Sequence, residues 1–142
     1  MSVVRLSPTW RAILVVLGIS LAAPGCGPSQ PVPVPVRGRV TYEGHPVATG
    51  SVMFTSTNKT LPNARGRLQE DGSFQLTTFE PDDGAVPGEY KVTIRAFKTG
   101  PGLDTSFAPP IPLVPRQYTT AGTTPIVKTI EQRDLNVIEI QL

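Results

Sequence analysis

Short stretches of the chain alternate hydrophobic and polar residues, and turn-forming residues bound each stretch. A repeat of two residues places hydrophobic side chains on one face of a β-strand and polar ones on the other. The clearest stretch is 88–98, where the hydrophobic positions are Tyr90, Val92, Ile94 and Ala96. The same pattern predicts strands over 36–42, 51–55, 73–77 and 136–142, and weaker ones over 64–69 and 126–130.

Turn-forming residues connect the predicted strands. Gly44-His45-Pro46 and Asp71-Gly72 are typical of tight turns, because glycine adopts positive φ without strain. After the first 25 residues, no stretch repeats at the 3.6-residue period of a helix. Six or seven short strands, each with one hydrophobic face, are buried most simply by two packed sheets or by a partly closed barrel. We therefore expect an all-β domain over residues 36–142, with either of these two arrangements.

The stretch 99–125 interrupts this pattern. It is rich in Pro, Gly and Thr and has no strong strand signal, and loops of this length are usually functional or disordered. Hydrophobic residues are nevertheless scattered through it, namely Leu103, Phe107, Ile111, Leu113, Val114 and Tyr118. We expect the segment to pack across the sandwich.

The N-terminal part has the features of a secretory signal. Arg5 and Arg11 give it positive charge, and residues 12–23 form an apolar run of 12 residues. That run is within the signal-peptide range and shorter than the about 20 residues of a membrane-spanning helix. The only cysteine, Cys26, follows closely. The region resembles a bacterial lipobox, in which small residues precede a cysteine that is lipidated and becomes the mature N-terminus.

We therefore expect residues 1–25 to be a signal peptide and Cys26 to anchor an exported protein to a membrane, on its periplasmic or cell-surface face. Acyl chains contribute about 0.8 kcal/mol per buried CH₂, so two chains anchor stably. An uncleaved anchor with an inert cysteine is the alternative. Residues 26–35 contain four prolines and are expected to form an extended linker. A proline-rich ligand for another protein is the competing interpretation of this segment.

Composition restricts the chemistry available to the chain. One His and one Cys among 142 residues exclude a His pair, a Cys–His dyad, a zinc cluster and an intrachain disulfide. The 16 prolines argue against a helical bundle. Loss of residues 1–25 removes Arg5 and Arg11, so the formal net charge falls from +2 to zero. No basic excess then indicates nucleic acid as a partner.

Four runs of residues together resemble a known family. They are VRGRVTYEGHPV at 36–47, GSVMF at 50–54, DGSF at 71–74 and DGAVPGEYKV at 83–92. In this order they are similar to carboxypeptidase regulatory-like domains, and especially to small exported bacterial lipoproteins built from one such domain. The likeness covers about residues 36–98 and holds in outline beyond them.

The resemblance implies a seven-stranded Greek-key β-sandwich, transthyretin-like (prealbumin-like), over residues 36–142, with a non-catalytic structural or binding role. The matching residues belong to turns and core, and include Tyr90, whose hydroxyl often caps nearby backbone in such domains. The fold also hosts hydroxyisourate hydrolases, but this chain lacks their several His residues and their C-terminal Tyr-Arg-Gly-Ser. We therefore expect no enzyme, no cofactor and no metal site, but a membrane anchor and an envelope protein or polysaccharide as partner.

The alternative function is a module that binds carbohydrate or another small ligand at the cell surface. Carbohydrate sites usually present exposed aromatic side chains on a flat face. Tyr118 and Phe107, both in the long loop, are the candidates for such a site.

Three further polar features have a chemical and a structural interpretation, and we expect the structural one for each. His45 is the only imidazole and is expected to be an exposed turn residue rather than a metal ligand or pH switch. Glu80, Asp82 and Asp83 could hold Ca²⁺, but they lack the alternating spacing of a calcium loop, which favours a solvated turn. Asn58-Lys59-Thr60 matches a glycosylation acceptor by coincidence.

Overall fold

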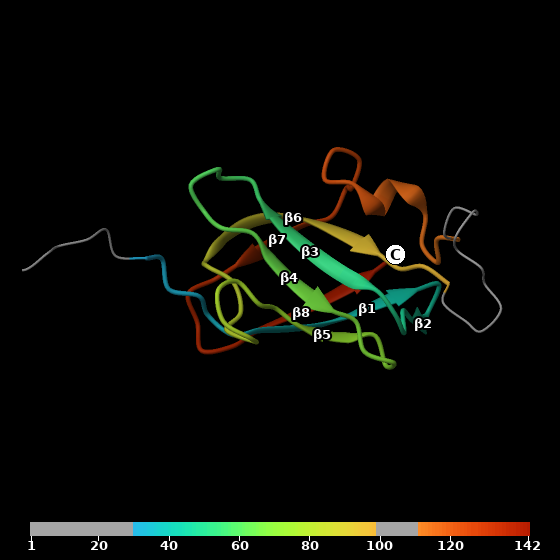
Figure 1. Cartoon of the computed structure of the whole chain (residues 1–142), viewed down its shortest axis with the longest axis horizontal. Helices are drawn as coiled ribbons and strands as arrows, with labels where there is room; N and C mark the ends of the chain where they lie inside the picture. The colour runs from blue at the N-terminus through green and yellow to red at the C-terminus, as the bar shows by residue number, and fades with distance from the viewer. Residues whose placement is uncertain (1–29, 99–110) are drawn as a thin grey trace, which may run out of the picture. The chain divides into compact units, whose positions relative to one another are not determined.

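The computed structural model describes residues 30–98 and 111–142. From Pro31 onward these residues form one compact unit. Its strands form two four-stranded sheets that lie one over the other, which confirms the expected all-β sandwich (Figure 1). The described residues contain eight strands, one of them only two residues long, where seven were expected. Among the described residues, no helix is long and apolar enough to cross a membrane.

The first sheet is built around β1 (Val36–Tyr42). Along one edge, β1 pairs antiparallel with β2 (His45–Pro46) and with β5 (Ser73–Gln75). Along the other edge it pairs parallel with β8 (Asn136–Gln141), so the first and last strands of the unit are hydrogen-bonded neighbours. This pairing brings the two ends of the folded unit together in one sheet.

The second sheet has four antiparallel strands. In spatial order they are β4 (Ala64–Arg67), β3 (Ser51–Ser56), β6 (Gly88–Arg95) and β7 (Val127–Ile130). Each strand predicted from the alternating pattern is present in one of the two sheets, with shorter ends in several cases. Beyond β6, residues 96–98 pair with 111–113, since the Lys98 N–H donates to the Ile111 carbonyl at 2.9 Å.

The first predicted turn lies one residue earlier than expected. Glu43 and Gly44 have φ values of 49° and 81°, which are the two positive angles that a type I′ hairpin turn requires. His45 and Pro46 are already paired with β1 as strand β2. The prediction that Gly44-His45-Pro46 forms the turn is therefore wrong for its last two residues.

The hydrophobic faces of the two sheets meet in one core. Phe54 of β3 lies at its centre, with its ring centroid 6.1 Å from those of both Phe74 and Tyr90. Phe74 comes from the other sheet and lies against β1 at Gly38. A Cβ at Gly38 would collide with the Phe74 ring and with the Ile138 carbonyl. The glycine is needed there because the ring occupies the space of a side chain.

The Asp71-Gly72 turn connects the two sheets. Gly72 has a φ of +76°, and the Gln69 N–H donates to the Ser73 carbonyl at 2.8 Å across the turn. Four residues further out, Arg65 and Thr77 exchange two backbone hydrogen bonds of 3.0 and 2.8 Å. Between these points β4 and β5 separate into different sheets. The predicted hairpin is thus present and forms one corner of the sandwich.

Two segments outside the predicted strands also belong to the packed unit. Val34, in the predicted linker, is 5% exposed and exchanges backbone hydrogen bonds of 2.9 and 3.0 Å with Ala85. In the long loop, Val114 is 3% exposed and joins the core. The loop also contains a short 3-10 helix, η1 (Arg116–Thr119), which packs against β6. The prediction that this loop packs on the sandwich is therefore confirmed for residues 111–125, whereas 99–110 lie outside the described residues.

Candidate functional site

The acidic turn, which contains Glu80, Asp82 and Asp83, is stabilised by the carboxylate of Asp83. Asp83 accepts backbone N–H hydrogen bonds from Thr78 at 2.6 Å and from Phe79 and Glu80 at 2.9 Å each. Partial burial raises the pKa of Asp83, but these backbone hydrogen bonds outweigh it and the net pKa is below the ordinary value. Asp83 therefore stabilises the turn. No group of three or more potential metal ligands is found among the described residues.

The other singled-out residues have separate places in the unit. His45 is exposed, as expected, although it lies on β2. The Asn58 side chain accepts hydrogen bonds from the Thr60 N–H and hydroxyl at 3.0 and 2.8 Å, which closes a local turn. Tyr118 is half-buried in η1. Cys26 and Phe107 lie outside the described residues, so the expectations about them stay predictions.

The Tyr90 hydroxyl has the capping role that the family resemblance implies. It is buried and donates a 2.7 Å hydrogen bond to the Val86 carbonyl, four residues before it in the chain. Burial raises the pKa of this hydroxyl above its ordinary value. Tyr90 thus ties the segment before β6 to the core.

A hollow in the described part of the chain lies on the outward side of β3, β4, β5 and β6. It has a cavity volume of about 970 Å³ and is open to solvent. Residues that alternate with the core along these strands line it, including Ser51, Met53, Arg65, Arg67, Gln75 and Arg95. We call this hollow the outer groove.

Strand register brings three arginines together in the outer groove. Ser51 of β3 lies opposite Arg67 of β4 and opposite Arg95 of β6, so one row across three strands contains both arginines. Arg65 lies two residues before Arg67 on the same strand and opposite Met53. From ordinary strand spacings, the Cα atoms of Arg65 and Arg67 are about 7 Å apart and those of Arg67 and Arg95 about 10 Å.

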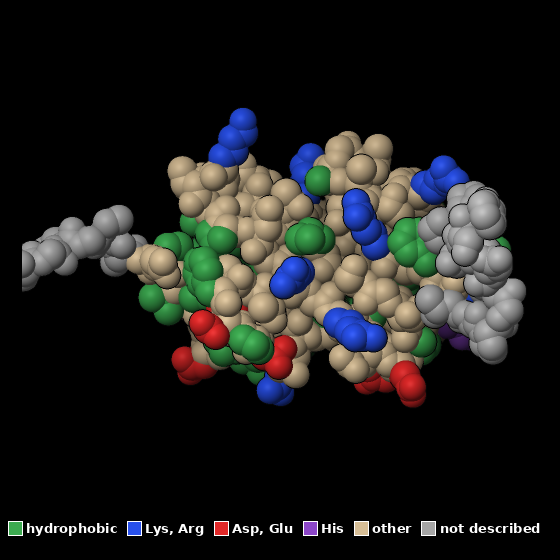
Figure 2. Space-filling view, viewed as in Figure 1, with side chains coloured by type: hydrophobic (Ala, Val, Ile, Leu, Met, Phe, Trp, Pro, Cys, Tyr) green, Lys and Arg blue, Asp and Glu red, His purple; other side chains and the backbone are tan. Residues whose placement is uncertain are grey.

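Positive charge dominates this face of the sandwich. Arg65, Arg67 and Arg95 are exposed, and within the described residues none of them forms an ion pair. Figure 2 shows Lys and Arg side chains over the middle of the face above β3 and β4, whereas Asp and Glu lie along its lower margin. The acidic residue that lines the groove is Asp82, in the turn after β5. Because positive and negative residues balance after residue 25, this cluster reflects separation of charges rather than an overall excess.

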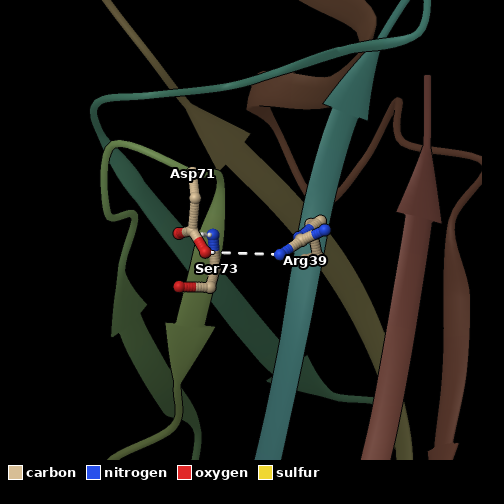
Figure 3. A network of polar contacts seen from close by, with 3 residues as sticks. All are labelled: Arg39, Asp71 and Ser73. Carbon is tan, nitrogen blue, oxygen red and sulfur yellow. Dashed lines mark hydrogen bonds and ion pairs between the residues drawn. The ribbon is translucent and has the colours of Figure 1, made fainter.

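The outer surface of the other sheet is different. There Arg39 of β1 forms a 3.3 Å ion pair with Asp71, and the Asp71 carboxylate also accepts a 2.9 Å hydrogen bond from the Ser73 N–H (Figure 3). Ser73, through its side chain and its backbone, lowers the pKa of Asp71 more than the charge of Arg39 does. Because of its ion pair with Asp71, the charge of Arg39 is partly neutralised, unlike the charges of the groove arginines.

Sequence reasoning did not find the outer groove. A signal was present in Ala64-Arg65-Gly66-Arg67, where arginines occupy alternate positions of a predicted strand and must share a face. Arg95 is on the outward side of its strand in the same way. What the pattern does not reveal is the register that places β4, β3 and β6 side by side.

Comparisons of this chain with protein-family models, with curated proteins and with solved structures give no match. The resemblance noted from the four runs of residues therefore stays an expectation, and any function assigned to the outer groove depends on its own geometry and charge.

Proposed function

We propose that the protein is an exported lipoprotein, in which a lipidated Cys26 tethers a non-catalytic β-sandwich to the cell envelope so that it can bind a partner there. The observation that carries this proposal is the position of the only cysteine, directly after an apolar run of 12 residues and a few small residues. Cleavage would remove residues 1–25 and leave the cysteine as the first residue.

The tether has a physical consequence for binding. Residues 27–33 contain three prolines and favour an extended chain of about 3.1 Å per residue, up to Val34, the first described residue whose side chain is buried in the sandwich. Such a spacer holds the sandwich close to the membrane while leaving its outer faces free. Confinement raises the local concentration of the module, so even weak contacts with envelope components become effective.

We also propose that the sandwich is a Greek key of the transthyretin-like kind. Strands β3, β4 and β5 follow one another through hairpins, and β6 returns through a longer connection to pair with β3. The resulting spatial order, fourth strand beside first, is that of a Greek-key motif. This strand order supports the family resemblance, in which such domains are structural or binding modules rather than enzymes.

Mass spectrometry of the mature protein tests the anchor. We expect a diacylated cysteine at the N-terminus of the protein recovered from membranes, and loss of membrane association in the Cys26→Ser variant. An unmodified Cys26 or retention of residues 1–25 would contradict the proposal. If the anchor is found, cross-linking in native envelopes would identify the partner of the anchored protein.

A further inference from the structure

We propose that the outer groove binds an anionic polysaccharide, one that carries carboxylate or sulfate groups along its length. The inference rests on the proposed function only for where the polymer is met, namely at the cell envelope. The groove itself is a property of the folded unit and can be tested separately from the lipid anchor.

Three guanidinium groups on one face suit a ligand with repeated negative charges. A guanidinium presents a planar fork of donors that bonds both oxygens of a carboxylate, a sulfate or a phosphate. Arg65, Arg67 and Arg95 lie in two successive outward-facing rows of the sheet, so they can contact successive charged groups of an extended chain.

The other lining residues suit a ligand rich in hydroxyl groups. Ser51, Gln69 and Gln75 are exposed in the groove and can each donate and accept hydrogen bonds. Met53, which is 40% exposed, and the half-buried Phe97 add apolar surface between the polar groups. This mixture of charge, hydrogen-bonding groups and small apolar patches matches the alternating polar and C–H surfaces of a sugar chain.

Other anionic partners fit these observations less well. Single-stranded nucleic acid is bound by stacking successive bases on aromatic side chains, and Phe97 is the one partly exposed aromatic residue that lines the groove in the described part of the chain. A polysaccharide that carries charges does not need the flat aromatic face of a neutral-sugar site, because the arginines can bind its anionic groups. A bilayer presents its anions on a flat surface, whereas these arginines line a hollow of about 970 Å³. An elongated, flexible polymer can follow such a hollow.

The test uses the full chain purified in a non-ionic detergent and three immobilised polymers: polygalacturonate, dextran sulfate and unmodified dextran. We expect binding to at least one charged polymer, no binding to dextran, and weakening as salt is raised. The variant R65Q/R67Q/R95Q should bind at least about tenfold more weakly. The matched control is R37Q/R39Q/R116Q, which removes the same charge from exposed positions outside the groove lining.

The control decides the outcome. Retention of binding in R37Q/R39Q/R116Q supports the groove, whereas an equal loss in both triple variants would show that only net charge matters and would overturn the proposal. Binding to anionic lipid vesicles or to single-stranded DNA in preference to both charged polysaccharides would also overturn it. If the groove triple variant does not melt cooperatively, R65Q and R67Q singly replace it. Failure here leaves the Cys26 anchor intact, and an unmodified cysteine leaves groove binding unchanged.

Discussion

The inward and outward side chains of the second sheet differ in burial and in whether their polar groups have partners. Inward, Phe54 and Tyr90 are fully buried and even the Tyr90 hydroxyl has a backbone partner. Outward, Arg65 and Arg95 are exposed and form no ion pair among the described residues. The inward side chains stabilise the fold, and the outward side chains are accessible to a ligand. Substitutions should therefore separate into those that change stability and those that change binding.

Adjacent positions on β3 give the largest expected contrast. Phe54→Ala removes a ring that packs against both Phe74 and Tyr90, and we expect it to lower the free energy of unfolding by about 4 kcal/mol. That is a large part of the total stability of a small domain. Met53→Ala, one residue away and 40% exposed on the other face, should change stability far less. Urea denaturation of both variants measures this, and similar losses would refute the assignment of faces.

The carboxylate of Asp83 tests whether polar groups at the edge of the core also contribute to the stability of the fold. In Asp83→Asn the amide nitrogen cannot accept the hydrogen bonds that the Phe79 and Glu80 N–H groups now donate to one carboxylate oxygen. We expect a loss of about 1–2 kcal/mol at neutral pH, reduced from the value for buried charged bonds because the turn is partly exposed. Thermal unfolding at several pH values measures it.

The pH dependence of that loss has a definite sign. Because the pKa of Asp83 is lower in the folded state, its stabilising contribution is complete above the unfolded pKa of about 3.9 and is lost as pH falls through the folded value. The difference between wild type and Asp83→Asn should therefore shrink on acidification below about pH 4. A difference that stays constant as the pH is lowered below about 4, over the range in which both variants remain folded, would contradict a role for the charged carboxylate.

Much of the fold follows from the two-residue repeat. The burial of Val36 and Val40, and of Ile138 and Ile140, alternates along β1 and β8 as predicted, because one face of each strand must leave water. The parallel pairing of these two strands could not be predicted in the same way. Alternation fixes which face of a strand is buried but not which strand lies beside it, since that depends on contacts between residues far apart in the sequence.

The candidate site was less accessible to sequence reasoning for the same reason. The predictions concerned residues that stand out individually in the sequence, such as His45 and the acidic turn, and among the described residues no three potential metal ligands come together. Arg67 and Arg95 are 28 residues apart in sequence and become neighbours only through Ser51, which lies between them in the sheet. A surface charge cluster assembled across strands requires the register as well as the pattern.

The smallest effect is expected at Arg39, the arginine that has a partner. The ion pair between Arg39 and Asp71 is exposed, and such pairs contribute little to stability. Arg39→Gln should therefore leave the melting temperature close to that of the wild type, and raising salt from about 0.05 to about 0.5 M should not separate the two further. The pKa of Asp71, followed by NMR, should rise only slightly in Arg39→Gln and more in Ser73→Ala, because Ser73 lowers that pKa most. If Arg39→Gln instead raised the pKa of Asp71 more than Ser73→Ala does, the ion pair would matter more than the turn, and Arg39 would belong with the residues that maintain the fold.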